Sequence, residues 1–562
     1  MKSKQNNKRA QVRSARFFDI LDKLIISGLV ILVLAFIFYP ILCVILRGVN
    51  VEGSFSLKVY QEVFTKNQKL LWNSAYVAII TALLSTVLAV GIATVVVFSG
   101  RLKGFLMGVL LVSMVSPPFI TSLSYIQLFG RRGSITHGLL GLSLDPYGPI
   151  GVIIMQTIFF ASLNALLLIG MMEKVDQNLL QAAADLGSDN NDTYFQVVLP
   201  LTLPGVIVCF LLSFVRSLAD YGTPVVIGGR YENLSTEIYM QLIGYANLEK
   251  SAALNTLLLV PAIVVFILYR LLMSKGNRLL QGGTPLKEEE MQHYRPRGLV
   301  YGLLLLPTVI FYGMMLLQYG SIFVNSFSKQ QKGVRTFSLE PFLQMWSRRK
   351  DTFFRSLVYA LVVALVGTLI GMLISYYIER RKLKGGKFFD FLVTAPYMIP
   401  GSCFGIGYIL AFNSEPIKLT GTAAIVILNM IFKQLSITTK VTSAAFTQIP
   451  EELDMASADL GAKRLQTLKD ILLPNLRSSF AVGFVNNFTS AMVTAGAVIF
   501  LVNAGQKIAV FTLFDAINSG KYAEASMIST VLILVTVLIN VIFLRLLKGK
   551  GGESHVSGIK GY

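Results

Sequence analysis

Charged residues are scarce in this chain. Asp, Glu, Lys and Arg make up only 14% of its 562 residues, whereas hydrophobic residues make up 54%. Soluble domains carry about 25% charged residues. Together with a mean hydropathy of +0.64, this scarcity excludes an ordinary soluble protein. The length would hold about a dozen membrane spans of about 20 residues each.

Cysteine and histidine are also rare, with three of each in the whole chain. The cysteines lie in apolar runs without pairing or ligand spacing, and the histidines lie far apart in loops, which argues against a disulfide framework, a zinc site or a membrane-embedded enzyme. We expect packing cysteines and solvated histidines. These residues are Cys43, Cys209, Cys403, His137, His293 and His555.

A phosphate-binding loop is missing. No Gly-x-x-x-x-Gly-Lys-Ser/Thr segment occurs, and the segments at 385–387 and 549–551 lack both the frame and the hydroxyl residue that cradle phosphates. We therefore expect no catalytic residue and no cofactor in this chain, and any ATP that drives it is hydrolysed by a separate chain.

The net charge of +20 does not indicate nucleic-acid binding, because the basic residues collect in short loops beside apolar runs rather than on one face. This placement follows the positive-inside rule. About 30 of the 50 Lys and Arg fall in segments that we place in the cytoplasm and about 18 fall outside, which puts both termini inside. The basic stretch before residue 24 precedes an apolar run too long for a cleavable signal peptide.

Apolar runs of spanning length occur about 12 times. Because such runs lack the alternating polarity of barrel strands, we predict an all-α polytopic membrane protein. The expected spans are 24–46, 71–98, 105–129, 149–171, 204–228, 254–273, 298–320, 354–378, 388–412, 421–440, 478–502 and 525–547.

These spans divide into two sets of six around a polar segment. The expected order is a cytoplasmic tail, a first repeat, a cytoplasmic linker, a second repeat and a second tail, at 1–23, 24–273, 274–297, 298–547 and 548–562. Asn73-Ser74 and Arg355-Ser356 open corresponding spans, and the prolines at 117–118 have an echo at 396–400. An even number of spans in each set makes the repeats parallel.

A duplicated motif carries the functional prediction. Its copies begin at Gln181 and Met455, and in each copy a Gly is followed, nine residues later, by a short apolar segment that ends in Leu-Pro. The motif residues are Gln181, Ala182, Ala183, Asp185, Gly187, Leu199, Pro200, and Met455, Ala456, Ser457, Asp459, Gly461, Leu473, Pro474.

Both copies resemble the Glu-Ala-Ala loop of ATP-binding-cassette importer permeases, with the leading Glu replaced by Gln181 or Met455 and the second Ala by Ser457 in the second copy. The resemblance implies a type I permease fold in which each loop docks on a cytoplasmic ATPase. Two loops imply two ATPase copies, an external substrate-binding protein and a bacterial inner-membrane location.

The motif also has a physical interpretation as a rigid elbow. Small residues let a helix approach a partner closely, and Gly187 and Gly461 stand where a helix needs a residue with positive φ. We expect Pro200 and Pro474 to end the next helix before the chain enters the membrane.

The segment after the fifth span, 219–239, resembles the ferric-iron branch of these permeases. Asp220, Tyr221, Tyr231, Glu232, Glu237 and Tyr239 gather oxygen atoms suited to a hard cation, although an aromatic belt at the membrane interface would also place tyrosines there. Arg216 and Asp220 are spaced to pair on one helix. The expected translocation-path residues are Arg216, Asp220, Tyr221, Glu237 and Tyr239, and the metal ligands are unknown.

Several interpretations stay open. Importers of 2-aminoethylphosphonate, polyamines or other small ligands share the elbows, and an ion-driven secondary transporter could also be built from parallel repeats, although most spans lack the buried ionisable residues it needs. We expect Lys433 to extend toward the cytoplasm, and the glycines at 405–407 and 367–371 to mark close helix packing.

Overall fold

The structure is a computed structural model that describes residues 20–51, 54–142, 145–279, 291–331, 334–462 and 464–548. Within these ranges the regular secondary structure is helical apart from two short antiparallel hairpins, β1–β2 (Asn50–Val51, Ser54–Phe55) and β3–β4 (Ser328–Gln331, Val334–Phe337). The all-helical prediction is confirmed. The predicted tails, 1–23 and 548–562, fall mostly outside the described residues, as does much of the linker at 274–297.

The long helices follow the predicted spans closely. In the described part of the chain nine helices are long and apolar enough to cross a membrane, or up to eleven if each of two bent helix pairs counts as one span. The main helices are α2 (Tyr39–Val49), α4 (Gln68–Val97), α5 (Lys103–Val115), α6 (Pro118–Phe129), α7 (Pro149–Met172), α10 (Leu199–Ala219) and α13 (Leu248–Leu279), then α15 (Gly298–Ser326), α16 (Glu340–Ser375), α17 (Gly386–Thr394), α18 (Gly401–Ala411), α19 (Ala423–Gln448), α23 (Arg477–Val493) and α25 (Tyr522–Lys548).

The eleventh predicted span is the short one. The apolar run at 478–502 forms α23, which has 17 residues and gives way to an irregular segment after Val493. The predicted number of about 12 therefore holds approximately.

The third span of each half is bent. The pair Gly100–Val115 and Phe119–Leu139 turns through 105°, and the pair Gly386–Tyr397 and Gly401–Ala411 turns through 109°. The prolines at 117–118 and at 400 lie at these bends, with extended backbone at Pro117 and Pro400. Proline lacks an N–H and disfavours helix in the residue before it, so each predicted continuous span becomes two half-helices.

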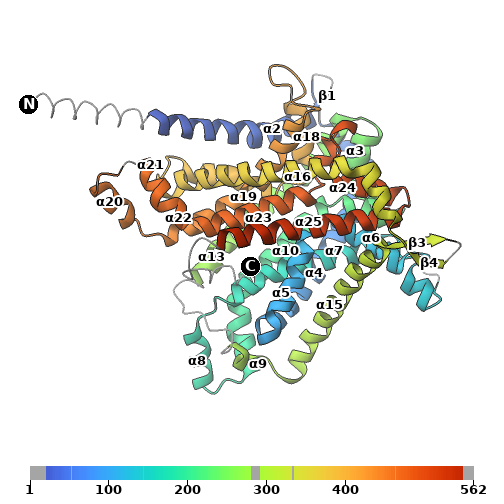
Figure 1. Cartoon of the computed structure of the whole chain (residues 1–562), viewed down its shortest axis with the longest axis horizontal. Coiled ribbons are helices and arrows are strands. Elements are labelled where there is room, and N and C mark those ends of the chain that lie inside the picture. The colour runs from blue at the N-terminus through green and yellow to red at the C-terminus, as the bar shows by residue number, and fades with distance from the viewer. Residues whose placement is uncertain are drawn as a thin grey trace, which may run out of the picture.

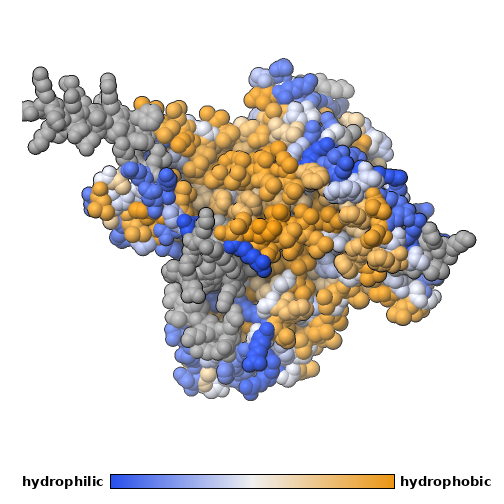
Figure 2. Space-filling view, in the orientation of Figure 1, coloured by the Kyte–Doolittle hydropathy of each residue, from blue (hydrophilic) through white to orange (hydrophobic). Residues whose placement is uncertain are grey.

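Figure 1 shows how these helices are arranged. The helices α8 (Gln177–Asp185) and α20 (Glu452–Asp459) project from one end, which we call the elbow end, and β3–β4 lies at the opposite end, the hairpin end. Between them, Figure 2 shows an apolar surface over α15, α16 and α25. Exposed leucines and valines cover these helices, as expected for a face in contact with lipid.

The first helix of each half packs on the other half. On α2, the Pro40 carbonyl lies so near Gly407 of α18 that a Cβ there would be 2.6 Å from its oxygen, and Tyr408 donates a hydrogen bond of 2.7 Å to the Phe36 carbonyl. In return, Tyr319 of α15 bonds Ser116 at 2.8 Å. The predicted role of the glycines at 405–407 in close packing is confirmed.

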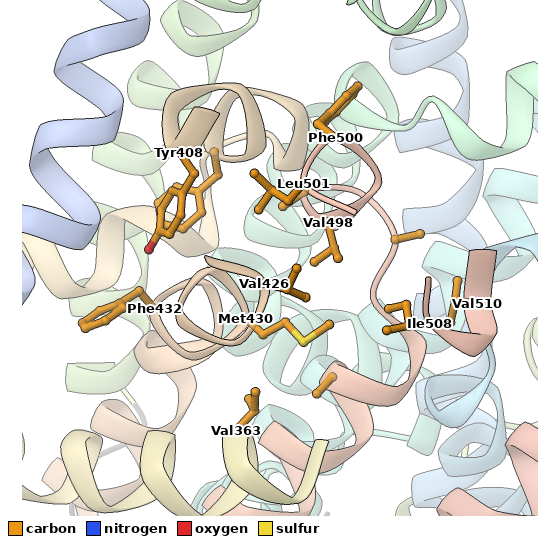
Figure 3. Packing of buried hydrophobic residues seen from close by; sticks show 14 of the residues in the cluster. Val363, Tyr408, Val426, Met430, Phe432, Val498, Phe500, Leu501, Ile508 and Val510 are labelled. Atoms are coloured by element: carbon orange, nitrogen blue, oxygen red, sulfur yellow. The ribbon is translucent and has the colours of Figure 1, made fainter. Parts of the chain in front are cut away.

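Most side chains of the largest core cluster come from the second half, and residues of the first half such as Ile37, Phe119 and Tyr221 join them; Figure 3 shows part of the cluster. The cluster includes Tyr408, Phe432 and Met430 from α18 and α19 together with Val498 and Phe500, which follow α23. Cys209 and Cys403 are buried and Cys43 is partly buried, and all three are free thiols, as predicted.

Candidate functional site

The two elbows have the same backbone geometry. Gly187 ends α8 with φ +86° and Gly461 ends α20 with φ +81°. In both, the Gly N–H bonds the carbonyl three residues back at 2.9 Å, and the next N–H bonds the carbonyl five residues back at 3.0 Å. Paired bonds of this type form the usual glycine stop of a helix. The predicted positive φ is confirmed at both glycines.

Each elbow has a solvent-exposed leucine next to its glycine. Leu186 is 88% exposed and Leu460 is 89% exposed. Most of the motif's small residues are exposed too, whereas Ser457 is buried and bonds Thr467 at 2.7 Å. Two large apolar side chains at matched positions, both surrounded by solvent, mark a surface suited to another protein.

The expectation for the prolines was wrong in detail. Pro200 ends no helix: the helical path continues from Asn190 to Ala219, through a π-turn at Tyr194–Val198. Pro474 likewise follows a π-turn, and the helix breaks only at Leu476. A π-turn shifts the hydrogen bonds by one residue, so the missing proline N–H at the start of the next segment costs little.

Arg216 and Asp220 do not pair as the spacing predicted. The helix α10 stops at Ala219, and Asp220 has extended backbone with ψ 110°, so the two side chains are not on one helical face. Asp220 instead accepts hydrogen bonds from Gln156 at 2.9 Å and from the Gly222 N–H at 2.9 Å.

Arg216 reaches across to the second half. Its guanidinium donates to the Tyr397 hydroxyl at 2.6 Å, and its carbon lies 5.4 Å from the centre of that ring. Tyr397 lies at the bend between α17 and α18. Sequence analysis missed this partner, although the proline-rich stretch around it marked the place.

The tyrosines predicted near the path form an aromatic stack. Tyr221 and Tyr239 are nearly parallel with ring centres 5.5 Å apart, and Phe500 of the second half lies 6.2 Å and 6.4 Å from them. Glu237 accepts from Gln241 at 2.7 Å and lies 3.8 Å from the Lys250 ammonium. The three rings therefore pack the first half of the chain against the second half.

These oxygens do not converge on a metal site. Burial raises the pKa of Tyr231 to about 12, and its hydroxyl donates to the Asn73 carbonyl at 2.7 Å. Burial also raises the pKa of Tyr239, so both phenols stay protonated at neutral pH. Within the described residues no group of three or more His, Cys, Asp or Glu side chains is arranged to hold a metal ion.

Lys433 does not extend toward the elbow end, as the sequence had suggested. Its ammonium donates to the carbonyls of Pro396 and Ile399 and lies 5.6 Å from the Phe404 ring centre. The bend between α17 and α18 leaves carbonyls without helical partners. Lys433 satisfies two of them, which outweighs the gain from reaching solvent.

Comparison with protein families gives one match over most of the chain. Residues 83–275 and 367–548 both match the binding-protein-dependent transport system inner membrane component. The ferric transport system permease protein FbpB of Actinobacillus pleuropneumoniae is 26% identical over 93% of this chain and 78% of its own length.

Two further relatives differ in how much of this chain they match. The protein named ferric transport system permease FbpB 1 in Haemophilus influenzae is 28% identical over 87% of this chain and 79% of its own length. The spermidine/putrescine transport system permease protein PotC of Escherichia coli K12 is 28% identical over 46% of this chain and 98% of its own length. One PotC-sized protein thus corresponds to about half of this chain.

Proposed function

Because the chain belongs to the family of binding-protein-dependent transport system inner membrane components, we propose that it couples to two copies of a cytoplasmic ATPase through its two elbows. It is a multi-pass permease of an ATP-binding-cassette importer. In this proposal it lies in the inner membrane of a bacterium with the elbow end and both termini in the cytoplasm.

The observation that carries the proposal is the pair of matched elbows. Each has the same glycine stop and the same exposed leucine at the same end of the molecule. Asp22, near the start of the first described helix, also bonds Arg381 at 2.6 Å beside the second elbow, which supports placing the N-terminus on the ATPase side.

The proposed translocation path runs between the halves. Arg216, Asp220, Tyr221, Glu237 and Tyr239 would line or control it, since Arg216 and the two tyrosines contact the second half directly. In the described conformation the stacked aromatic rings keep the two halves in contact. Nucleotide-driven movement of the elbows would separate these contacts.

We propose ferric iron as the cargo, delivered by an external substrate-binding protein. Support comes from the two ferric-named relatives, which align over most of the chain, and from the segment at 219–239. The neutral phenols and the lack of a ligand cluster in the described residues favour transient passage of iron over stable binding.

Reconstituted vesicles test this function. The permease would be purified with its ATPase partner, placed in vesicles with the iron-loaded binding protein on the outside, and supplied with ATP inside. We expect ATP-dependent uptake of labelled Fe³⁺ and none of labelled putrescine.

A double variant, Leu186→Ser with Leu460→Ser, should lose both ATPase co-purification and uptake. Leu139→Ser is the matched control, because Leu139 is 78% exposed but ends the short helix Ser134–Leu139, outside both elbows. Iron uptake that survives the double variant would reject coupling through the elbows, whereas putrescine uptake without iron uptake would reject the cargo.

A further inference from the structure

The two elbows are attached to their helical bundles at equivalent positions. Gly100 lies shortly after α4, and Lys382 lies shortly after α16 and the π-turn Tyr376–Arg380 that continues it. Both residues have positive φ, at +56° and +46°. Phe98 lies two residues before Gly100, and Arg380 lies two residues before Lys382, so Phe98 and Arg380 occupy equivalent positions. Leu180 lies seven residues before Gly187, and Asp454 lies seven residues before Gly461, so these two residues are also equivalent.

In the first half this joint is apolar. Phe98 is 1% exposed and Leu180 is 0% exposed, and both belong to the same buried cluster of the first half. Leu180 is the buried residue of α8. At this position the first elbow is held by exclusion of water from hydrocarbon, which has no directional requirement. An ion pair between Lys103 and Glu173, at 2.7 Å, lies just before α8.

In the second half the same joint is ionic. The Arg380 guanidinium lies 3.4 Å from the Asp454 carboxylate, and the Arg380 side chain is only 5% exposed. It also donates to the carbonyls of Phe446 and Ile449, and its carbon lies 5.8 Å from the Phe446 ring centre.

The carbonyls explain why an arginine is used. Phe446 lies in the last turn of α19, and Ile449 follows its last residue, Gln448. Carbonyls at a helix C-terminus lack helical partners and carry partial negative charge. A planar guanidinium with five donors can satisfy these carbonyls and a carboxylate together, which a lysine cannot.

We propose that Arg380 is the positioning residue of the second coupling helix, α20, at the place where the first half has the apolar side chain of Phe98. Arg380 fixes the start of α20 to the end of α19, so α20 follows movement of the second bundle. Phe98 and Leu180, which lie in one buried cluster, hold the corresponding place at α8. That α20 and α8 couple to an ATPase rests on the function proposed above.

Spin-label mobility tests the attachment without any ATPase. Labels at Leu186→Cys or Leu460→Cys, each placed in a chain whose three native cysteines are replaced by alanine, report the two elbows from equally exposed sites. With Arg380→Phe we expect the label at 460 to gain mobility by at least about threefold in rate while the label at 186 is unchanged. The reason is that the Asp454 carboxylate, 33% exposed, and the Ile449 carbonyl lose the buried guanidinium that joins them.

Phe98→Ala is the reciprocal variant, and it should mobilise the label at 186 only. Lys382→Ala is the matched control near the second elbow, since the Lys382 and Glu451 side chains form an ion pair at 3.2 Å that is 72% and 64% exposed. It should change neither label. A label at 460 that stays immobile in Arg380→Phe, or two labels that respond alike, overturns the proposal.

A rescue variant separates positioning from general damage to the fold. Arg380→Phe combined with Asp454→Leu copies the apolar pair of the first half, and it should recover most of the lost order at 460, whereas Arg380→Lys should recover less. Absence of recovery by the apolar pair contradicts the equivalence of the joints.

Transport distinguishes this proposal from the function on which it rests. In vesicles, Arg380→Phe should lower the cargo moved per ATP hydrolysed by at least about threefold. If the label at 460 becomes mobile and this ratio does not change, Arg380 still positions α20 but the elbow is not the coupling element. If neither changes, Arg380 has no positioning role.

Discussion

Ser74 and Ser356 make the same hydrogen bond in the two halves. The Ser74 hydroxyl accepts from the Leu234 N–H, and the Ser356 hydroxyl accepts from the Ala509 N–H, both at 2.7 Å. Leu234 and Ala509 each begin a helix, α12 (Leu234–Tyr239) and α24 (Ala509–Asn518). A membrane-spanning helix thus caps a short helix in each repeat.

Removing either acceptor should destabilise the permease. Ser74→Ala and Ser356→Ala each leave a helix-starting N–H without its partner, at a cost of about 1–3 kcal/mol. Thermal unfolding of the detergent-solubilised chain measures the loss, and the two effects should add because the two hydrogen bonds share no residue. A double variant no less stable than the single variants would contradict independent caps.

The glycine stops should be required for coupling but not for insertion. Gly187→Pro with Gly461→Pro cannot adopt positive φ, so the elbows should lose their shape while the membrane-embedded helices remain intact. We expect normal amounts in the membrane, and ATP hydrolysis without uptake.

Alanine gives a graded version of this test. Because a Cβ at Gly187 or Gly461 meets nothing within 4 Å, the effect of Gly→Ala is the backbone cost alone, about 1–2 kcal/mol. Gly170→Ala, at an equally open site with ordinary φ, serves as the control and should not destabilise. Equal behaviour of all three alanine variants would show that positive φ is irrelevant.

The contact from Arg216 to Tyr397 should hold the halves together at rest. Tyr397→Phe keeps the ring under the guanidinium but removes the hydrogen bond, which is worth about 1.5–3 kcal/mol for a charged donor. We expect ATP hydrolysis in the absence of binding protein to rise, and to rise further in Tyr397→Ala. Unchanged basal hydrolysis in both variants would separate this contact from the resting state.

Lys433 should stabilise the bend between α17 and α18. Lys433→Met leaves the carbonyls of Pro396 and Ile399 without their donor, at about 1–3 kcal/mol for each group. Lys440→Met is the control, since Lys440 pairs with Asp390 at 2.5 Å but its side chain is 50% exposed, where such pairs contribute about 0–1 kcal/mol. Similar shifts in the unfolding midpoint for both variants would contradict the role given to Lys433.

Local sequence patterns predicted the elbows and most spans well. Positive φ at Gly187 and Gly461 follows from an Ala-rich helix ending in Gly, and the spans follow from hydropathy. Long-range partners could not be predicted in this way. Arg216 has Asp220 four residues away, yet it bonds Tyr397, because α10 ends between the two and the second half lies closer.

The prolines show a similar limit. Pro117 and Pro400 bend their spans as proline chemistry suggests. Pro200 does not break its helix, because a π-turn precedes it, and no residue pattern predicts that π-turn. Lys433 was misplaced because its carbonyl partners are freed only by a bend in another helix.

The packing of α2 on α18 also has a consequence for synthesis. At roughly 5–20 residues per second, a ribosome makes Gly407 tens of seconds after Pro40, so the first helix enters the bilayer long before its partner exists. An isolated first half would therefore leave the first helix, α2, without α18 to pack against. Joining both repeats in one polypeptide ensures that each copy of α2 is followed by its own α18.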